Sequence, residues 1–155
     1  MIQKSSYFDQ QVLLALSEHL TSGGYSGPLY NMSLALLGAP ALLTPATKWS
    51  QLTEASYTGY ARQNGLTWGV PLLQPDGTYQ ILSALTTWIA AAGSNFVNGV
   101  IYGWALLDTS ATPDLLMSEI FASAIPIINP NDGFGLVIQI SEGINNPASM
   151  GNVIQ

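Results

Sequence analysis

The chain contains a single histidine, the residue type most often used as a general acid or base. His19 directly follows Glu18 and lies two residues after Ser17, which makes a hydrolytic Ser-His-acid triad the first chemistry to consider. These residues fall in a segment that we predict to be helical, and adjacent residues of a helix do not face each other. We therefore expect His19 to be a surface residue of that helix.

Carboxyl groups are the next candidates, because a glycosidase needs only a pair of them. Three aspartates fall in expected turns, where Asp commonly bonds its own backbone, and three glutamates fall at the edges of expected strands. These acids are Asp76, Asp108, Asp132, Glu54, Glu119 and Glu142. No local pattern singles out a catalytic pair, so we expect the protein not to be an enzyme.

Metal and phosphate sites have little support in the sequence. A chain without Cys and with one His cannot build a zinc or iron–sulfur site. Asn129, Asn131 and Asp132 form a cluster of oxygen ligands, but a single carboxylate is too little charge for a tight calcium site and the cluster is typical of a turn. The lone Gly133-Phe-Gly135 has no following helix that would point at a phosphate. We expect no cofactor and no metal.

Aromatic residues are concentrated on segments predicted to be strands. They are Tyr57, Tyr60, Trp68, Trp88, Tyr102 and Trp104. Tyr60 and Arg62 share a strand face, so Arg62 can stack on Tyr60 or on a neighbouring ring, and Tyr102 and Trp104 are expected to share a face for the same reason. Such rings can bind sugars. Because Trp, Tyr and Arg are also enriched in subunit interfaces, we favour a sandwich core or an interface.

Residues 1–24 are expected to form an N-terminal helical arm. Ser6 and Asp9 resemble an acidic capping box, and Gly23-Gly24 supplies a stop signal. One helical face over residues 7–20 is apolar and consists of Phe8, Val12, Leu13, Leu16 and Leu20. This face packs either on the chain's own domain or on another subunit, and the sequence leaves both alternatives open.

After Gly24 the pattern becomes that of short strands separated by turns. The expected strands include residues 29–37, 56–63, 66–68, 86–91, 100–107, 115–122, 125–128 and 136–141. Asn64-Gly65 predicts a hairpin, and Pro75-Asp76-Gly77 predicts a turn with strands on both sides. We therefore expect an all-β fold, a jelly-roll-like β-sandwich or small barrel of about eight strands over residues 25–142. One N-terminal helix precedes it, and residues 143–155 form a tail.

The composition is unusual in its lack of charge. Three Lys and Arg and nine Asp and Glu give a net charge of −6, and these twelve charged residues compare with roughly 39 expected for this length. So few basic residues cannot track a phosphate backbone, and we expect no nucleic-acid partner. No stretch approaches the roughly 20 apolar residues of a membrane span, and the N-terminus lacks the apolar core of a signal peptide. We expect no membrane partner.

Several segments carry recognisable motifs. The first is Leu52-Thr-Glu-Ala-Ser-Tyr-Thr-Gly-Tyr-Ala-Arg-Gln63, followed by Leu66-Thr-Trp-Gly69. The later ones are Val100-Ile-Tyr-Gly-Trp-Ala-Leu-Leu-Asp108 and Leu115-Leu-Met-Ser-Glu-Ile-Phe121. In this order the chain resembles, over residues 29–141, small tailed-bacteriophage structural proteins, in which a Trp-Gly or Phe-Gly strand follows the first segment. The resemblance implies a non-enzymatic virion component, either a capsid decoration or cement protein or a fibre-like protein.

The leading hypothesis is a capsid cement protein that binds and stabilises the phage head by bridging major capsid protein subunits. We expect a homotrimer on the capsid surface of the virion, assembled in the host cytoplasm. The alternative is a fibre-like protein of the head, neck or tail with receptor or carbohydrate binding. The residues expected at interfaces are Tyr7, Phe8, Val12, Leu13, Leu16, Tyr57, Tyr60, Arg62, Tyr102 and Trp104.

Overall fold

The computed structural model describes residues 3–4, 32–69, 72–75, 78–108, 110–143 and 152–153. Apart from residues 3–4, the expected helical arm lies outside these ranges. The interface candidates on that arm, Tyr7, Phe8, Val12, Leu13 and Leu16, therefore lie outside the described residues too. The same holds for most of the expected tail, so the boundaries predicted at both ends stay predictions.

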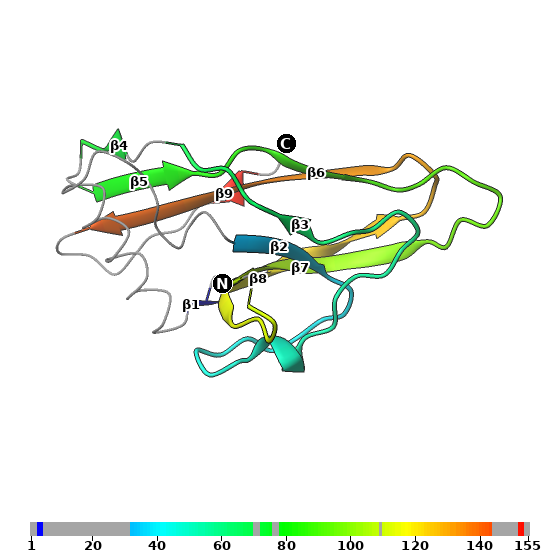
Figure 1. The fold of residues 1–155 in the computed structure, drawn as a ribbon, viewed down its shortest axis with the longest axis horizontal. Coiled ribbons are helices and arrows are strands. Elements are labelled where there is room, and N and C mark those ends of the chain that lie inside the picture. Colours follow the sequence, from blue (N-terminus) through cyan, green and yellow to red (C-terminus); the bar gives the residue numbers. More distant parts are fainter. Residues whose placement is uncertain are drawn as a thin grey trace.

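The described residues form a β-sandwich of two antiparallel sheets, as Figure 1 shows. Sheet 1 contains, in spatial order, β1 (Gln3–Lys4), β8 (Leu115–Ile127), β7 (Gly99–Asp108), β2 (Met32–Leu37) and β3 (Gln63–Asn64). Sheet 2 contains, in spatial order, β10 (Asn152–Val153), β9 (Gly133–Gly143), β5 (Thr78–Leu82) and β4 (Leu72–Leu73). A further strand, β6 (Thr86–Ile89), pairs with the first residues of β9, whereas β5 pairs with its last ones. The predicted all-β sandwich is confirmed. In this part of the chain, no helix has the length and apolar character needed to cross a bilayer.

The core of the protein is the layer of side chains between the two sheets. Along β9, Leu136, Ile138 and Ile140 are buried, as the alternation of the predicted strand 136–141 requires. From sheet 1, Leu34 and Trp104 reach the same core and are fully buried. Burial of these apolar side chains removes them from water and holds the sheets together.

A bulge interrupts the pairing of β7 with β8. Ile101 pairs with Ile125 and Gly103 pairs with Ile120, so residues 121–124 of β8 lie opposite Tyr102 alone. The strands predicted at residues 115–122 and 125–128 are therefore one continuous strand. Because Ile101 and Trp104 both reach the core between the sheets, the two-residue alternation that predicted a common face for Tyr102 and Trp104 does not hold here.

The loop between β2 and β3 covers the outer face of sheet 1. This face carries Ala35, Leu37, Ala105 and Leu107, all of them fully buried. Trp49, in the short 3-10 helix η2 (Trp49–Gln51), and Leu52 pack onto it. In Figure 1 this loop lies below sheet 1, on the side away from sheet 2. The chain therefore shields the outer apolar face of sheet 1 by itself.

Residues 52–69 connect the two sheets along one side of the sandwich. The strand predicted at residues 56–63 is wrong except at its end. The segment makes a turn at residues 58–59, where its backbone bonds to the loop after β6 and not to a neighbouring strand. The hairpin predicted at Asn64-Gly65 is also wrong. Gly65 has a φ of 70° and its N–H donates to the Met32 carbonyl at 3.1 Å. The chain then crosses to sheet 2, where Trp68 forms a β-bridge with Ser83.

The strands predicted on both sides of Pro75-Asp76-Gly77 are confirmed, while residues 76–77 themselves lie outside the described residues. Leu72 pairs with Gln80 and Leu73 pairs with Tyr79, so β4 and β5 form a hairpin. The pairing adds the two-residue strand β4 to the edge of sheet 2.

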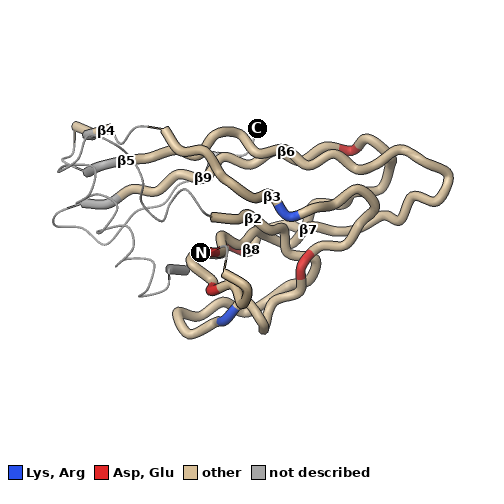
Figure 2. The backbone as a smooth tube through the Cα atoms, viewed as in Figure 1, with Lys and Arg blue, Asp and Glu red and all other residues tan. Residues whose placement is uncertain are grey.

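Charged residues are distributed unevenly over the sandwich. The sequence carries no charge between Asp76 and Asp108, a stretch that includes all of β5 and β6. Figure 2 shows the described charged positions mostly around sheet 1 and its loops, while the tube along β6 and the described part of β9 is tan. On the side of sheet 2, the charged residue with a described side chain is Asp132, in the turn before β9. The two sheets therefore present surfaces of different character.

Candidate functional site

Hydrogen bonds hold residues 52–63 to β2 on one side and to the loop after β6 on the other. On the side of β2, the Ala55 N–H donates to the Leu36 carbonyl at 2.8 Å. On the other side, the Ala91 N–H donates to the Thr58 carbonyl at 3.0 Å, and the Val97 N–H donates to the Thr58 hydroxyl at 2.7 Å. The segment therefore ties sheet 1 to the loop that follows β6.

Glu54 is the centre of a side-chain network within this segment. The Tyr60 hydroxyl donates to Glu54 Oε1 at 2.7 Å and accepts the Leu36 N–H at 3.1 Å. Burial of the Tyr60 ring, followed by the hydrogen bond to Glu54, raises the pKa of the hydroxyl well above its ordinary value. Tyr60 thus stays protonated and acts as a fixed link between Glu54 and the backbone of β2.

Arg62 completes the network from the other side of the carboxylate. Its Nη2 donates to Glu54 Oε2 at 2.6 Å and its Nε donates to Oε1 at 3.2 Å, which is a bidentate pair. The hydrogen bond to Glu54 raises the pKa of the guanidinium above its usual value. The guanidinium also lies 5.1 Å from the centre of the Trp49 ring. Arg62 was expected to stack on Tyr60 or on a neighbouring ring, and the ring that it contacts in this way is that of Trp49.

We refer to Glu54, Tyr60, Arg62 and Trp49 as the Glu54 network. The Tyr60 and Arg62 bonds engage both carboxylate oxygens of Glu54, so they are occupied by groups of the same chain. A general acid or base must be free to exchange a proton with a substrate. The network is therefore suited to fixing the loop before β3 against β2, and it offers no free catalytic group.

Two of the predicted interface residues are buried inside the chain. Tyr57 is 3% exposed and Trp104 is fully buried, and the Trp104 indole N–H donates to Glu119 Oε2 at 3.1 Å. The Tyr57 hydroxyl has no hydrogen-bond partner in the part of the chain that the structure describes, and burial raises its pKa. Tyr102 is half-buried and belongs to neither core cluster. Tyr57 and Trp104 therefore offer little surface to a partner.

The oxygen cluster before β9 forms a turn, as its residue types predict. Asp132 Oδ2 accepts the N–H groups of Asn129 at 2.8 Å and of Ile128 at 2.9 Å, and these bonds lower the pKa of the carboxyl. Asn131 adopts a φ of 71°. Across the described ranges, no three His, Cys, Asp or Glu residues lie close enough together to hold a metal. His19 lies outside the described residues.

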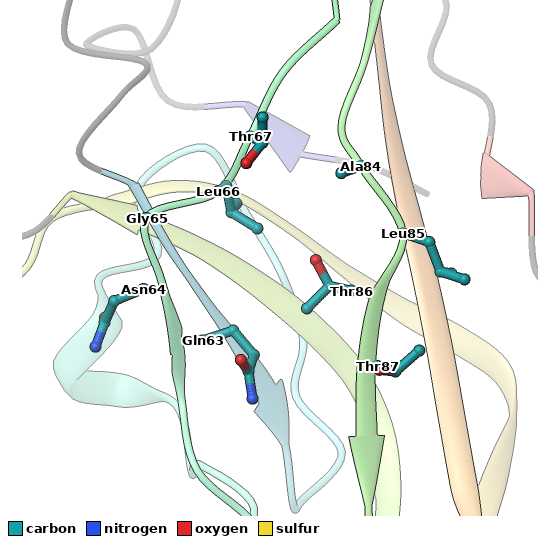
Figure 3. Close-up of a pocket in the computed structure, with 9 residues that line it drawn as sticks. All are labelled: Gln63, Asn64, Gly65, Leu66, Thr67, Ala84, Leu85, Thr86 and Thr87. Atoms are coloured by element: carbon teal, nitrogen blue, oxygen red, sulfur yellow. The ribbon is translucent and has the colours of Figure 1, made fainter.

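A pocket of about 270 Å³ lies where the chain before Trp68 separates from β6. It is lined by Gln63, Asn64, Gly65, Leu66, Thr67, Ala84, Leu85, Thr86 and Thr87. In Figure 3, Leu66 and Thr86 point into the gap between the two segments, whereas Leu85 points away from it. The lining is made of amides, hydroxyls and aliphatic groups without a charge or an aromatic ring. The pocket can take a small neutral group but has no residue that could drive a reaction.

The outer face of sheet 2 is the other candidate site, and it is an exposed surface instead of a pocket. We call it the sheet-2 face and define it by Leu82, Leu85, Thr87, Ile89, Gly133 and Gly135. Leu82 is 41% exposed, Leu85 59% and Ile89 61%. Across the pairing with β9, Thr87 lies opposite Gly135 and Ile89 lies opposite Gly133. The face therefore combines a row of protruding apolar side chains on the β5–β6 side with a glycine strip on β9, where Gly133 and Gly135 carry no side chains and the surface is lower.

Comparison with known proteins does not add a family to this description. No protein-family model, no curated protein and no solved structure matches the chain. The resemblance of residues 52–63 to phage structural proteins therefore rests on the sequence segments themselves. What the structure adds is a physical role for the segment at residues 52–63, since its Glu, second Tyr and Arg are three of the four members of the Glu54 network.

Proposed function

We propose that the chain is a structural virion protein that cements the phage head by binding across neighbouring major capsid protein subunits. It acts on the capsid surface as a homotrimer and assembles there from the host cytoplasm. Its activity is binding. Each contact that bridges two capsomers strengthens the shell, because that contact must also break before the shell can yield to the pressure of packaged DNA.

The observation that carries this proposal is the amount of apolar surface outside the core. Besides the sheet-2 face, Leu42 is 91% exposed, Val97 60% and Ile128 58%, and these residues lie on different loops and turns. A free monomer normally relies on surface charge to stay apart from its neighbours, and this chain has twelve charged residues in 155. Several subunit contacts on different sides would remove this liability, as repeated contacts in a shell do.

The Glu54 network supports the same proposal from another direction. The segment that resembles phage structural proteins uses its ionisable side chains to fix a loop and not to form an open site. A segment with that role is expected in a protein whose task is to keep its shape under load. It does not favour an enzyme.

The pocket beside β6 favours the second candidate, a fibre-like protein that binds a receptor or carbohydrate. Its amide and hydroxyl groups suit a neutral hydroxylated ligand. Sugar sites usually add an exposed ring, and the described side chains of Tyr57, Trp88 and Trp104 are instead buried. We therefore rank this function below cementing.

Binding to separated virion parts tests the two functions against each other. Labelled chain is mixed with DNA-filled heads, isolated tails and host cells of the phage that encodes it. We expect it to co-sediment with heads, to saturate at a fixed ratio to the major capsid protein and to raise the temperature at which heads release DNA, because added bridging contacts strengthen the shell. Unlabelled chain should compete for the same sites. Binding to tails or cells with none to heads would contradict cementing and favour the fibre-like function.

A further inference from the structure

The exposed side of sheet 2 breaks the usual pattern of a half-buried antiparallel sheet. Such a sheet normally places apolar side chains toward the core and polar side chains toward water. In β6, Trp88 follows this pattern inward at 2% exposed, but Ile89 is 61% exposed on the outer side. Leu85 and Leu82 extend the apolar surface toward β5. Several exposed large apolar side chains on one sheet face are a feature of interaction sites.

The two outer faces of the sandwich differ in how they are covered. The outer face of sheet 1 is also apolar, with Leu37 and Leu107 fully buried beneath the loop that carries Trp49. On the sheet-2 face, Leu85 and Ile89 remain more than half exposed. Among the described residues, a loop therefore covers the outer face of sheet 1, and none covers the sheet-2 face in the same way.

We infer that the sheet-2 face is the surface through which copies of this chain bind one another, with sheet 2 of each copy turned toward a common axis. The inference rests on the homotrimer of the proposed function and names its contact. Around a three-fold axis, one patch of each copy meets a different patch of the next copy, and residues close to the axis lie near the same residues of the other two copies. A charged side chain near the axis would therefore meet its own sign.

The charge distribution fits a second copy as the occupant. The chain carries a net charge of −6, so two copies repel each other wherever their acidic surfaces meet. The sheet-2 face contains no charged residue, and the nearest acids in the sequence of β9 and its turn are Asp132 before the strand and Glu142 near its end. Contact through this face keeps both acids at the ends of the interface.

The shape of the face also suits contact with a like surface. Gly133 and Gly135 carry no side chain, and a Cβ built on Gly135 would lie 3.2 Å from Leu85 Cδ1. The leucine thus leans over the edge of the glycine strip. The apolar row of one copy can pack against the low strip of the next, which brings apolar groups into close contact without burying a charge.

Lysine substitutions on and off the face test the inference in solution. Leu85→Lys and Ile89→Lys place like charges beside each other at the axis, whereas the control Leu42→Lys changes an even more exposed leucine, on the loop over sheet 1. By sedimentation velocity we expect wild type and Leu42→Lys to be trimers. The two face variants should be monomers, with association weakened at least about 100-fold because juxtaposed like charges cost several kcal/mol.

Thr87→Lys is a second way to charge the same face, at an exposed polar position where folding is not at risk. Circular dichroism checks that each variant retains the wild-type strand content. A wild-type chain that stays monomeric, or face variants that assemble like wild type, would overturn the inference. A monomer that still binds heads would overturn it and leave cementing in place. A trimer of the wild-type chain that binds no heads would contradict cementing and leave the inference in place.

Discussion

Replacing Gly103 with alanine is expected to destabilise the protein by about 3 kcal/mol or more, which corresponds to a fall in Tm of roughly 10 °C for a chain of this size. A Cβ at this position would lie 2.0 Å from the Glu119 carbonyl oxygen and 3.0 Å from Ile120 Cα. Both atoms belong to the backbone of β8, so no side chain can turn away to relieve the clash. Strands β7 and β8 would have to separate beside the buried Trp104.

Urea and thermal unfolding of the purified variants measure this effect. The matched control is Gly69→Ala, because a Cβ there would meet only the Leu82 carbonyl oxygen at 3.5 Å, an ordinary contact. We expect the control to change stability by no more than about 0.5 kcal/mol. A Gly103→Ala protein as stable as the control would show that β8 can move aside, and the described bulge would then not be a fixed feature.

Replacing Glu54 with alanine is expected to cost about 2 kcal/mol. The change leaves the Tyr60 hydroxyl and the Arg62 guanidinium without their shared acceptor, and removing one partner of a buried ion pair costs roughly 3–5 kcal/mol. The side chains of Arg62 and Glu54 are 28% and 27% exposed, so water recovers part of that cost. The loop that carries Trp49 should also become more mobile, because the Arg62 guanidinium packs over the Trp49 ring.

The measurement is the free energy of unfolding, with Trp fluorescence to follow the loop around Trp49. Glu54→Gln keeps one carbonyl acceptor and should lose about half as much, or about 1 kcal/mol. Asp114→Ala is the control, since Asp114 is an exposed acid whose side chain makes no hydrogen bond within the described residues. Equal stability of Glu54→Ala and Asp114→Ala would mean that the Glu54 network does not hold the loop.

Strands with regular alternation could be predicted well from the sequence. In β9 the isoleucines and Leu136 repeat every second residue, and no local interaction competes with that pattern. The errors lie where tertiary contacts override local preference. Residues 56–63 have the composition of a strand, but the backbone of Thr58 bonds to the loop after β6 and not to a neighbouring strand. The chain does bend at Gly65, but the residues that follow bond to Leu82 and Ser83 on the side of sheet 2 instead of folding back on β3.

The candidate sites were predictable to different degrees. The pairing of Tyr60 with Arg62 follows from their spacing, but the role of Glu54 does not, because the contact needs the turn at residues 58–59 that the strand prediction missed. The sequence did carry a signal for the sheet-2 face in the uncharged run between Asp76 and Asp108. That run cannot tell which of its apolar residues point outward, since this depends on the pairing of β6 with β9.

Taken together, these features connect the scarcity of charge to assembly. The core and the loop over sheet 1 account for part of the apolar content, and the Glu54 network binds two of the charges to each other. What remains is the sheet-2 face and the exposed residues Leu42, Val97 and Ile128. If subunit contacts are the reason for this surface, it should be covered in the particle where the protein works.

A density map of the intact virion tests this account most directly. We expect copies of the chain on the outside of the capsid, grouped as trimers over junctions between major capsid protein subunits, with Leu82, Leu85 and Ile89 of each copy buried against another copy. The account would be contradicted by a map in which the chain is absent from the capsid, or in which it sits there as a monomer with the sheet-2 face open to solvent.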